Sequence, residues 1–351
     1  MVENQKSLGN PQPDQDEQRA VRIGEENVPD DESEDIRRLA DLEAQIHQAV
    51  GNSRRGQHPK GHGAVWARFQ ILAGLDEQLR VGIFRPSRDY TAVIRFSNGK
   101  EEDDTNKDVH GMAIKVFVPG ESDPEKIVIQ DFVLADIAVF FAGNVKDLFE
   151  FSMTMASAPA PQRAETAFKL ASTPKYKNLA HFRQKPPASP LEAKYWSQTP
   201  YRWGISAVKY HILPSPENAV PTLPQKKKSS KNFLREAMAE RLTFQKRPAS
   251  FDFCIQLQTD PGTMPIEDPT IAWTSDFIKV ATITIYPQTF DSARQLKFCE
   301  DMSFNPWHGL PEHCPLGGIN RARRSIYEAS CSLRNQTNNV IVKELTGRER
   351  F

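Results

Sequence analysis

Short stretches in which apolar and polar side chains alternate dominate the middle of the chain, and this pattern predicts β-strands. It is clearest at residues 251–257, where Phe251, Phe253, Ile255 and Leu257 share one face, and again at residues 278–285. Further strands are expected at residues 65–72, 81–84, 91–97, 111–118, 126–132 and 207–212. Too little helical sequence lies between most of these segments for parallel β–α–β units. We therefore expect one continuous antiparallel β core.

Apolar residues at helical spacing occur outside these strands. They predict helices from about residue 35 to 50 and over residues 145–171, 232–241 and 290–298. The aromatic segment 195–203 is expected to be turn-like. Two glycines, Gly317 and Gly318, open a last helical segment that is rich in arginine and runs on to Arg334.

Both ends of the chain are polar. Residues 1–34 are acidic and poor in apolar side chains, so we expect a disordered N-terminal arm. Residues 341–351 are expected to form a polar C-terminal tail. Residues 35–340 then make up a single folded domain, and the predicted fold class is α+β.

The charge balance gives no reason to expect nucleic acid as a partner. The 351 residues include 45 Lys and Arg against 45 Asp and Glu, so the net charge is zero. No apolar run is long enough for a membrane span, and the N-terminus lacks the apolar segment of a signal peptide. The four cysteines have no CxxC spacing and are expected to be reduced thiols. These observations predict a cytoplasmic protein.

The last helical segment carries the first candidate chemistry. Arg323 and Tyr327 are four residues apart, so they share one face of a helix. A guanidinium beside a phenol favours the phenolate form, and tyrosinate is one of the few axial ligands of haem iron. An Arg–Tyr pair at this spacing is more often a stacked surface pair. The interpretation as a ligand therefore depends on other parts of the chain.

Four stretches, in order along the chain, together resemble the catalase superfamily. They are Arg55-Gly-Gln-His58-Pro-Lys-Gly, then Ile94–Gly99 with Lys107–Lys115, then Asp131–Phe141, and finally Arg323-x-x-x-Tyr327 with Arg334. The resemblance covers residues 40–335 and is greatest to short, divergent catalase-related haem proteins. It implies a catalase-like antiparallel β-barrel of about eight strands with an N-terminal arm and peripheral helices.

The resemblance implies haem b as the cofactor. Tyr327 corresponds to the proximal ligand that binds the iron as tyrosinate, and Arg323 to the residue that keeps it deprotonated. Arg55, Arg95 and Arg334 correspond to the arginines that bind the haem propionates, because a planar guanidinium pairs both oxygens of a carboxylate.

On the distal side the resemblance assigns His58 as the acid–base residue, which takes a proton from one peroxide oxygen and returns it to the other. Ser97 corresponds to the residue that orients its ring. Two phenylalanines, Phe141 and Phe149, are expected to wall the haem pocket. The alternatives are a loop histidine that caps backbone groups at His58, His62 as the base in a shifted register, and plain core aromatics.

One departure from the family pattern changes the expected activity. Where catalases carry an asparagine pair, this chain has Ala135-Asp136. An ionised Asp136 accepts hydrogen bonds but cannot donate one to peroxide. We therefore expect a haem peroxidase or catalase-like oxidoreductase that acts on hydrogen peroxide or organic hydroperoxides with a small-molecule reductant.

Two other functions remain open. One is rearrangement of lipid hydroperoxides, as in the allene-oxide-synthase-like branch of this fold. The other is haem binding without turnover. It remains an alternative because Asp136 replaces the asparagine that catalases carry. A homo-oligomer is also compatible with the N-terminal arm.

Overall fold

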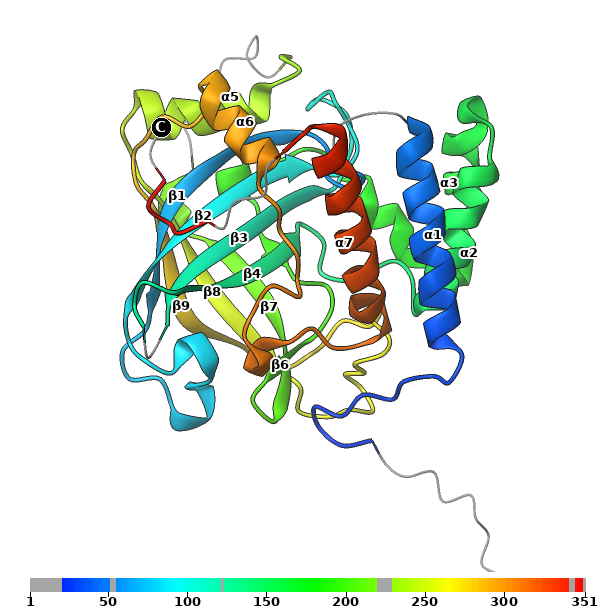
Figure 1. Cartoon of the computed structure of the whole chain (residues 1–351), viewed down its shortest axis with the longest axis horizontal. Coiled ribbons are helices and arrows are strands. Elements are labelled where there is room, and N and C mark those ends of the chain that lie inside the picture. The colour runs from blue at the N-terminus through cyan, green and yellow to red at the C-terminus, as the bar shows by residue number, and fades with distance from the viewer. Residues whose placement is uncertain (1–20, 51–54, 121–122, 220–228, 341–344, 350–351) are drawn as a thin grey trace, which may run out of the picture.

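The chain folds around a β-barrel in the computed structural model (Figure 1). The structure describes residues 21–50, 55–120, 123–219, 229–340 and 345–349. Its strands are β1 Gly61–Ile71, β2 Asp89–Asn98, β3 His110–Pro119, β4 Ile127–Ala135, β5 Tyr195–Trp196, β6 Tyr201–Trp203, β7 Ser206–Pro214, β8 Ala249–Leu257 and β9 Phe277–Ile285. All pairings between them are antiparallel.

The two-residue strand β5 closes the barrel. Neighbouring strands follow the order β5-β4-β3-β2-β1-β9-β8-β7-β6, and β5 also pairs with β7. The eight strands β1–β5 and β7–β9 therefore form a closed ring, and β6 is the partner of β7 in a short hairpin. This arrangement confirms the predicted α+β fold with an antiparallel barrel of about eight strands.

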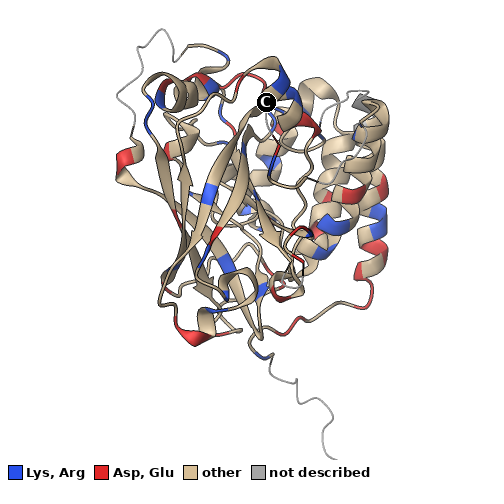
Figure 2. Cartoon of the chain, turned by 60° about the vertical axis from the view of Figure 1, so that its left-hand side comes forward, with Lys and Arg blue, Asp and Glu red and all other residues tan. Residues whose placement is uncertain are grey.

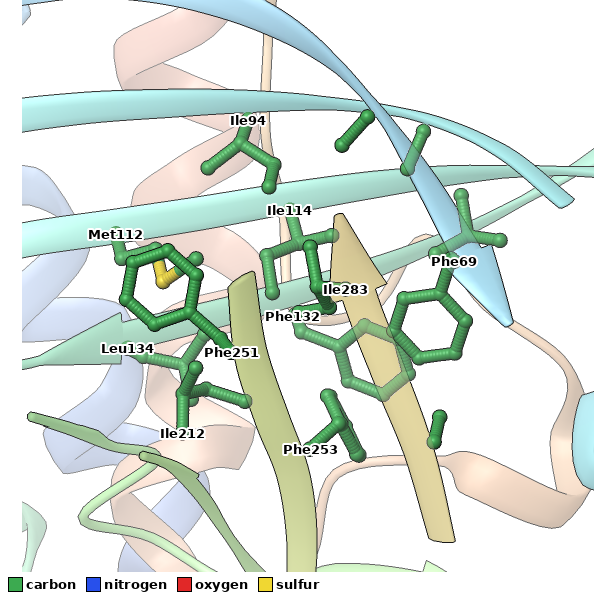
Figure 3. Close-up of a cluster of buried hydrophobic side chains, with 14 of the residues drawn as sticks. Phe69, Ile94, Met112, Ile114, Phe132, Leu134, Ile212, Phe251, Phe253 and Ile283 are labelled. Carbon is green, nitrogen blue, oxygen red and sulfur yellow. The ribbon is translucent and has the colours of Figure 1, made fainter. Parts of the chain in front are cut away.

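Inward-facing aromatic and aliphatic side chains fill the barrel (Figure 3). The rings of Phe69 and Phe132 each pack edge-on against Phe253, with centroids 5.1 and 4.8 Å apart. This is a favourable geometry for aromatic pairs. Because β8 alternates as predicted, Phe251, Phe253 and Ile255 all reach the same core.

Two strand predictions differ from the structure. Residues 81–84 were expected to form a strand but contain a 3₁₀ turn, because Gly82 has a φ of +51° and packs directly against the ring of His313. The segment 195–203, expected to be turn-like, contains β5 and β6. Strands of two and three residues are too short to show an alternating pattern.

The helices are α1 Glu32–Val50, α2 Val145–Ser157, α3 Arg163–Ala171, α5 Phe233–Ala239, α6 Ala293–Asp301 and α7 Gly318–Thr337. A π-helical turn, Glu240–Phe244, continues α5. Shorter 3₁₀ helices span Glu77–Leu79, Gly82–Phe84, Ala160–Gln162, Pro174–Phe182, Pro190–Glu192, Pro216–Asn218 and Pro311–His313. The expected single helix over residues 145–171 is divided at Pro159 and Pro161, which cannot continue α2. Within the described part of the chain, no helix has the length and hydropathy that a membrane crossing requires.

The start of α7 is fixed by acidic side chains. The guanidinium of Arg321 contacts Glu26, Glu32 at 2.6 Å and Glu267 at 2.7 Å. The backbone N–H groups of Gly317 and Gly318 donate to Glu26 and Glu267. Carboxylates at a helix N-terminus also offset the positive end of the helix dipole. Residues 21–34 of the predicted arm are therefore held against α7, whereas residues 1–20 lie outside the described residues.

Basic and acidic residues are interspersed over the helices and loops (Figure 2). Of the predicted polar tail, residues 345–349 are described, and Arg348 pairs there with Glu125 at 2.9 Å. Both side chains of this pair are mostly exposed, so the contact adds little stability.

Candidate functional site

A cavity lies between α7 and the outer face of strands β2, β3 and β4, which lie beside one another in Figure 1. It encloses about 940 Å³, counting the space at its mouth that is open to solvent. Six of the ten predicted site residues line it: Arg55, His58, Arg95, Ser97, Tyr327 and Arg334. The fold therefore brings residues from both ends of the chain to one place.

The barrel wall of the cavity is made by outward-facing positions of neighbouring strands. Arg95 on β2 is level with Ala113 on β3, which is level with Val133 on β4. Ser97 is likewise level with Gly111. The two β3 positions therefore carry small residues, whereas Arg95 on β2 has a long side chain.

His58 lies in the loop before β1, with an unusual positive φ of 55°. Its N–H donates to the carbonyl of Gly99 at 3.0 Å, and its carbonyl accepts from Arg95 Nη2 at 2.9 Å. The ring nitrogen Nδ1 is 3.2 Å from Ser97 Oγ. A Cβ atom at Gly111 would come within 2.7 Å of the same ring, so glycine is needed there. These contacts fix the ring at the cavity.

Burial, assisted by the positive charge of Arg95, lowers the pKa of His58 to about 4. Asp108 and Asp136 oppose this shift without cancelling it. The imidazole is therefore neutral near pH 7 and has a nitrogen that can accept a proton.

Three buried guanidinium groups gather at the cavity. Arg55 Nη2 donates to the carbonyls of Cys299 at 3.1 Å, Glu300 at 3.0 Å and Met302, and Arg334 Nη2 also donates to the carbonyl of Met302, at 3.2 Å. The Nε atoms of Arg55, Arg95 and Arg334 are all buried without a hydrogen-bond partner. Burial and the charges of Arg95 and Arg334 hold the pKa of Arg55 well below its usual value.

Glu300 is the carboxylate near this cluster, at 4.0 Å from Arg55 and 3.9 Å from Arg95. Three positive charges therefore face one negative charge, which leaves two positive charges uncompensated among the described residues. Buried cations with orphaned N–H donors favour an anionic ligand. The donor set fits a ligand with two carboxylates, as haem has in its propionates.

One face of α7 supplies the opposite wall. Tyr327, Ser330, Cys331 and Arg334 follow one another at helical spacing and all line the cavity. One turn earlier, Arg323 Nη1 donates to Thr199 Oγ1 at 3.0 Å, and its guanidinium lies 5.3 Å from the ring centre of Phe140.

Tyr201 connects Arg323 with Tyr327. Burial raises the pKa of Tyr201 to about 12, while Arg323 lowers it and Tyr327 raises it. Arg323 and Tyr327 on α7 therefore both lie close enough to Tyr201 to influence its pKa.

The other predicted site residues do not line the cavity. Both carboxylate oxygens of Asp136 accept from His110, one from the backbone N–H at 2.8 Å and one from ring Nδ1 at 2.7 Å. Phe141 packs in an aromatic cluster with Phe140 and Phe151, with ring centroids 4.6 and 4.7 Å away. Phe149 packs between α1, α2 and α7, and the guanidinium of Arg38 lies 4.4 Å from its ring centre.

Sequence reasoning missed three ionisable residues at the site: Glu43, Glu300 and Cys331. Glu43 on α1 lines the cavity, and burial raises its pKa against a hydrogen bond from Ser152 Oγ at 3.1 Å. The sequence does contain a signal for Glu43. It lies one helical turn after the fully buried Leu39 and thus places a charge within an apolar helix face. Glu300 and Cys331 have no such signal.

No known protein family model matches this chain, and no curated protein matches it. Solved structures do: catalase A from Saccharomyces cerevisiae superposes with a TM-score of 0.64 at 20% identity, over 83% of this chain and 63% of that one. A fungal catalase gives a TM-score of 0.62 at 17% identity, over 83% of this chain and 60% of that one. A bacterial catalase gives 0.58 at 16% identity, over 95% of this chain and 67% of that one.

At these identities the likeness shows the fold and not the activity. The chain also spans less than two thirds of the first two catalases. The molecule thus has a catalase-like fold, and its chemistry must be argued from its own residues.

Proposed function

We propose that this protein is a haem-dependent oxidoreductase that binds haem b in the cavity between β2–β4 and α7. The observation that carries the proposal is the cluster of Arg55, Arg95 and Arg334, with two uncompensated positive charges and three orphaned Nε–H donors. A ligand with two carboxylates would satisfy this cluster. Gly111 and Ala113 on β3 are small and leave room for a ligand between this strand and α7.

When bound, haem supplies an iron that exchanges electrons with peroxide. Tyr327 is the residue on the α7 wall with an oxygen that can ligate this iron as tyrosinate. Arg323 is one turn away on the same helix, and its guanidinium would pair with the negative charge of such a ligand.

His58 is the proposed acid–base residue. It is neutral above about pH 4, so it can accept a proton from one peroxide oxygen and later deliver it to the other. Ser97 Oγ at Nδ1 orients the ring, and the clamp on the His58 backbone from Gly99 and Arg95 holds it at the cavity.

The arrangement around Asp136 favours peroxidase over catalase activity. Its two oxygens are occupied by His110, so it offers no donor group to peroxide. We therefore propose reduction of hydrogen peroxide or organic hydroperoxides with electrons from a small-molecule reductant. Disproportionation of hydrogen peroxide is expected to be slow.

The direct test is to add haem to the purified apoprotein and record its spectrum. We expect a ferric tyrosinate spectrum, which Tyr327→Phe abolishes while the exposed-site control Tyr286→Phe retains it. Identical spectra for wild type and Tyr327→Phe would overturn the ligand assignment.

Oxygen release from hydrogen peroxide should then be compared with oxidation of a reducing dye by hydrogen peroxide and by a lipid hydroperoxide. We expect dye oxidation to exceed oxygen release. Conversion of lipid hydroperoxide without dye oxidation would favour the rearranging function. A haem spectrum without turnover of either peroxide would leave a haem-binding protein.

A further inference from the structure

A second hollow adjoins the cavity between α7 and the segment 303–308. It shares Ser303, Phe304, Tyr327 and Cys331 with the cavity, so it reaches the proposed iron ligand from another side. We call this hollow the proximal groove. On the same count, which includes space open to solvent, it measures about 1340 Å³.

A histidine in the groove wall is oriented by a buried carboxylate. The Nδ1 atom of His308 is 3.2 Å from Asp131, whose side chain is fully buried, while the side chain of His308 is 45% exposed. Lys115 Nζ also binds both oxygens of Asp131, at 2.6 and 2.8 Å. The Asp131 backbone N–H donates to the His308 carbonyl at 2.7 Å. His308 is thus held through both its ring and its backbone.

This pairing determines which ring nitrogen is basic. An ionised carboxylate can only accept hydrogen bonds, so Nδ1 of His308 must carry the hydrogen. In the neutral ring, Nε2 then has the lone pair. This Nε2 lone pair can accept a proton from a ligand in the groove.

The other walls indicate the chemical class of a ligand. Phe304 and Tyr327 offer aromatic surface, and Asn335 contributes a buried Oδ1 acceptor for which the described residues provide no donor. The described lining contains no Lys or Arg, and its carboxylate, Glu328, pairs with Arg324 at 3.7 Å. The groove therefore offers an anion no cationic partner in its described lining and favours a neutral aromatic molecule that carries hydroxyl donors.

We propose that the proximal groove binds a neutral hydroxylated aromatic reductant, of the phenol or hydroquinone class, with His308 as its proton acceptor. The inference rests on the proposed function and names the reductant that it requires. In each step an O–H bond of the reductant breaks. Its proton passes to His308 Nε2 and from there to solvent, and its electron would pass to the haem, which leaves a neutral reductant radical. Two such steps supply the two electrons and two protons with which one hydrogen peroxide forms two waters.

The first test needs no haem. Equilibrium dialysis of the haem-free full chain with hydroquinone should detect binding. Ser332→Trp, in which the new side chain fills the groove, should abolish this binding, whereas Thr337→Trp on an exposed site near the end of α7 should not. Absence of binding to the wild type, or equal binding by both variants, would overturn the inference and leave the proposed haem function intact.

The second test separates proton transfer from structure. In His308→Gln the amide can still donate to Asp131, but it cannot take up a proton. We expect this variant to bind hydroquinone and to react with hydrogen peroxide like the wild type, yet to oxidise hydroquinone about a hundredfold more slowly. The matched control is His181→Gln at an exposed site.

Unchanged hydroquinone oxidation in His308→Gln would show that the pair with Asp131 only fastens the segment 303–308, and the inference would fail. Ascorbate, an anionic reductant, should be oxidised more slowly than hydroquinone by the wild type. The opposite preference would contradict the assigned reductant class. Loss of the haem spectrum or of the peroxide reaction in the wild type would instead count against the proposed function.

Discussion

The carboxylate of Asp136 accepts two hydrogen bonds from His110, one from the backbone N–H at 2.8 Å and one from ring Nδ1 at 2.7 Å. The backbone N–H of Asp136 donates in return to the His110 carbonyl at 2.9 Å. The position that the sequence comparison marks as a departure is therefore a closed pair rather than a free carboxylate. It cannot contribute to peroxide chemistry without first breaking these bonds.

Asp136→Asn should destabilise the protein before it adds activity. The amide oxygen can still accept from the His110 N–H, but its NH2 group can donate to Nδ1 only in the other ring tautomer, so a hydrogen bond to a charged group is replaced by a weaker neutral one. The expected decrease in the free energy of unfolding is about 1 kcal/mol, measured by urea denaturation. Asp41→Asn, at an exposed pair on α1, is the control and should change it by less than about 0.5 kcal/mol.

A gain in catalase activity should require release of the new amide from His110. We expect the double variant His110→Ala/Asp136→Asn to raise the ratio of oxygen release to dye oxidation above that of Asp136→Asn alone. Equal ratios in the single and double variants would show that His110 does not restrain this side chain.

The arginine cluster should strengthen haem binding and should not stabilise the haem-free protein. In the haem-free protein, Arg334 lies beside two other buried cations, so Arg334→Met should leave the unfolding free energy unchanged or raise it. The same change should weaken haem binding about ten- to a hundredfold, because a hydrogen bond to a charged group is lost. Haem titration and thermal unfolding of the apoprotein measure the two effects.

Arg324→Met, at a 63% exposed site on the same helix, should change neither quantity. If Arg334→Met strongly destabilised the apoprotein and left haem affinity intact, the cluster would be structural, and the central support for haem binding would be lost.

Alternation in the sequence was sufficient to predict an antiparallel β core, whereas the barrel and six of the residues that meet at the cavity were implied by the resemblance of four short stretches to catalases. Alternation located most strands, because each inward position must be apolar and each outward position need not be. The short motifs at Arg55–His58, Arg95–Ser97 and Tyr327–Arg334 identified side chains that now line one cavity. Closure of the barrel by the two residues of β5 could not be predicted, because so short a strand has no periodicity.

The contacts between individual side chains also could not be predicted from the sequence. Asp136 was expected to face peroxide, but His110 offers it two donors, and no pattern in the sequence indicates which of several partners a carboxylate will contact. The positions of Phe141 and Phe149 depend likewise on how α2 packs against its neighbours. Such contacts follow from tertiary structure and not from local spacing.

The pH dependence of the peroxide reaction should report the lowered pKa of His58. Only the neutral ring accepts a proton, and it stays neutral as the pH falls from the ordinary histidine value of 6.5 to about 4. We expect the rate of reaction with peroxide to be constant through weakly acidic pH and to decrease near pH 4. His58→Gln should lower this rate by at least about a hundredfold while the haem spectrum remains. An acidic limb near pH 6.5 would contradict the buried, neutral ring.

The stability of the apoprotein should also depend on pH, and the buried ring of His313 should be one cause of this dependence. Burial lowers the pKa of His313 to about 4, and its Nε2 accepts a hydrogen bond from the Ile83 N–H at 3.3 Å. Between pH 6.5 and 4 the unfolded chain therefore binds a proton that the folded chain does not. The contribution of the neutral His313 ring to the free energy of unfolding is fully present above pH 6.5. It is lost as the pH falls toward 4, which lowers the free energy of unfolding by up to about 3 kcal/mol.

His313→Gln should reduce this pH dependence, because the amide oxygen can still accept from Ile83 but does not titrate. The free energy of unfolding, measured in urea at a series of pH values, should therefore vary less with pH than in the wild type. It should be lower than in the wild type near neutral pH, since glutamine lacks the ring that packs against Phe84 and Trp203. His181→Gln, at an exposed histidine, should keep the full pH dependence of the wild type. An unchanged pH dependence in His313→Gln would show that this ring is already protonated in the folded protein.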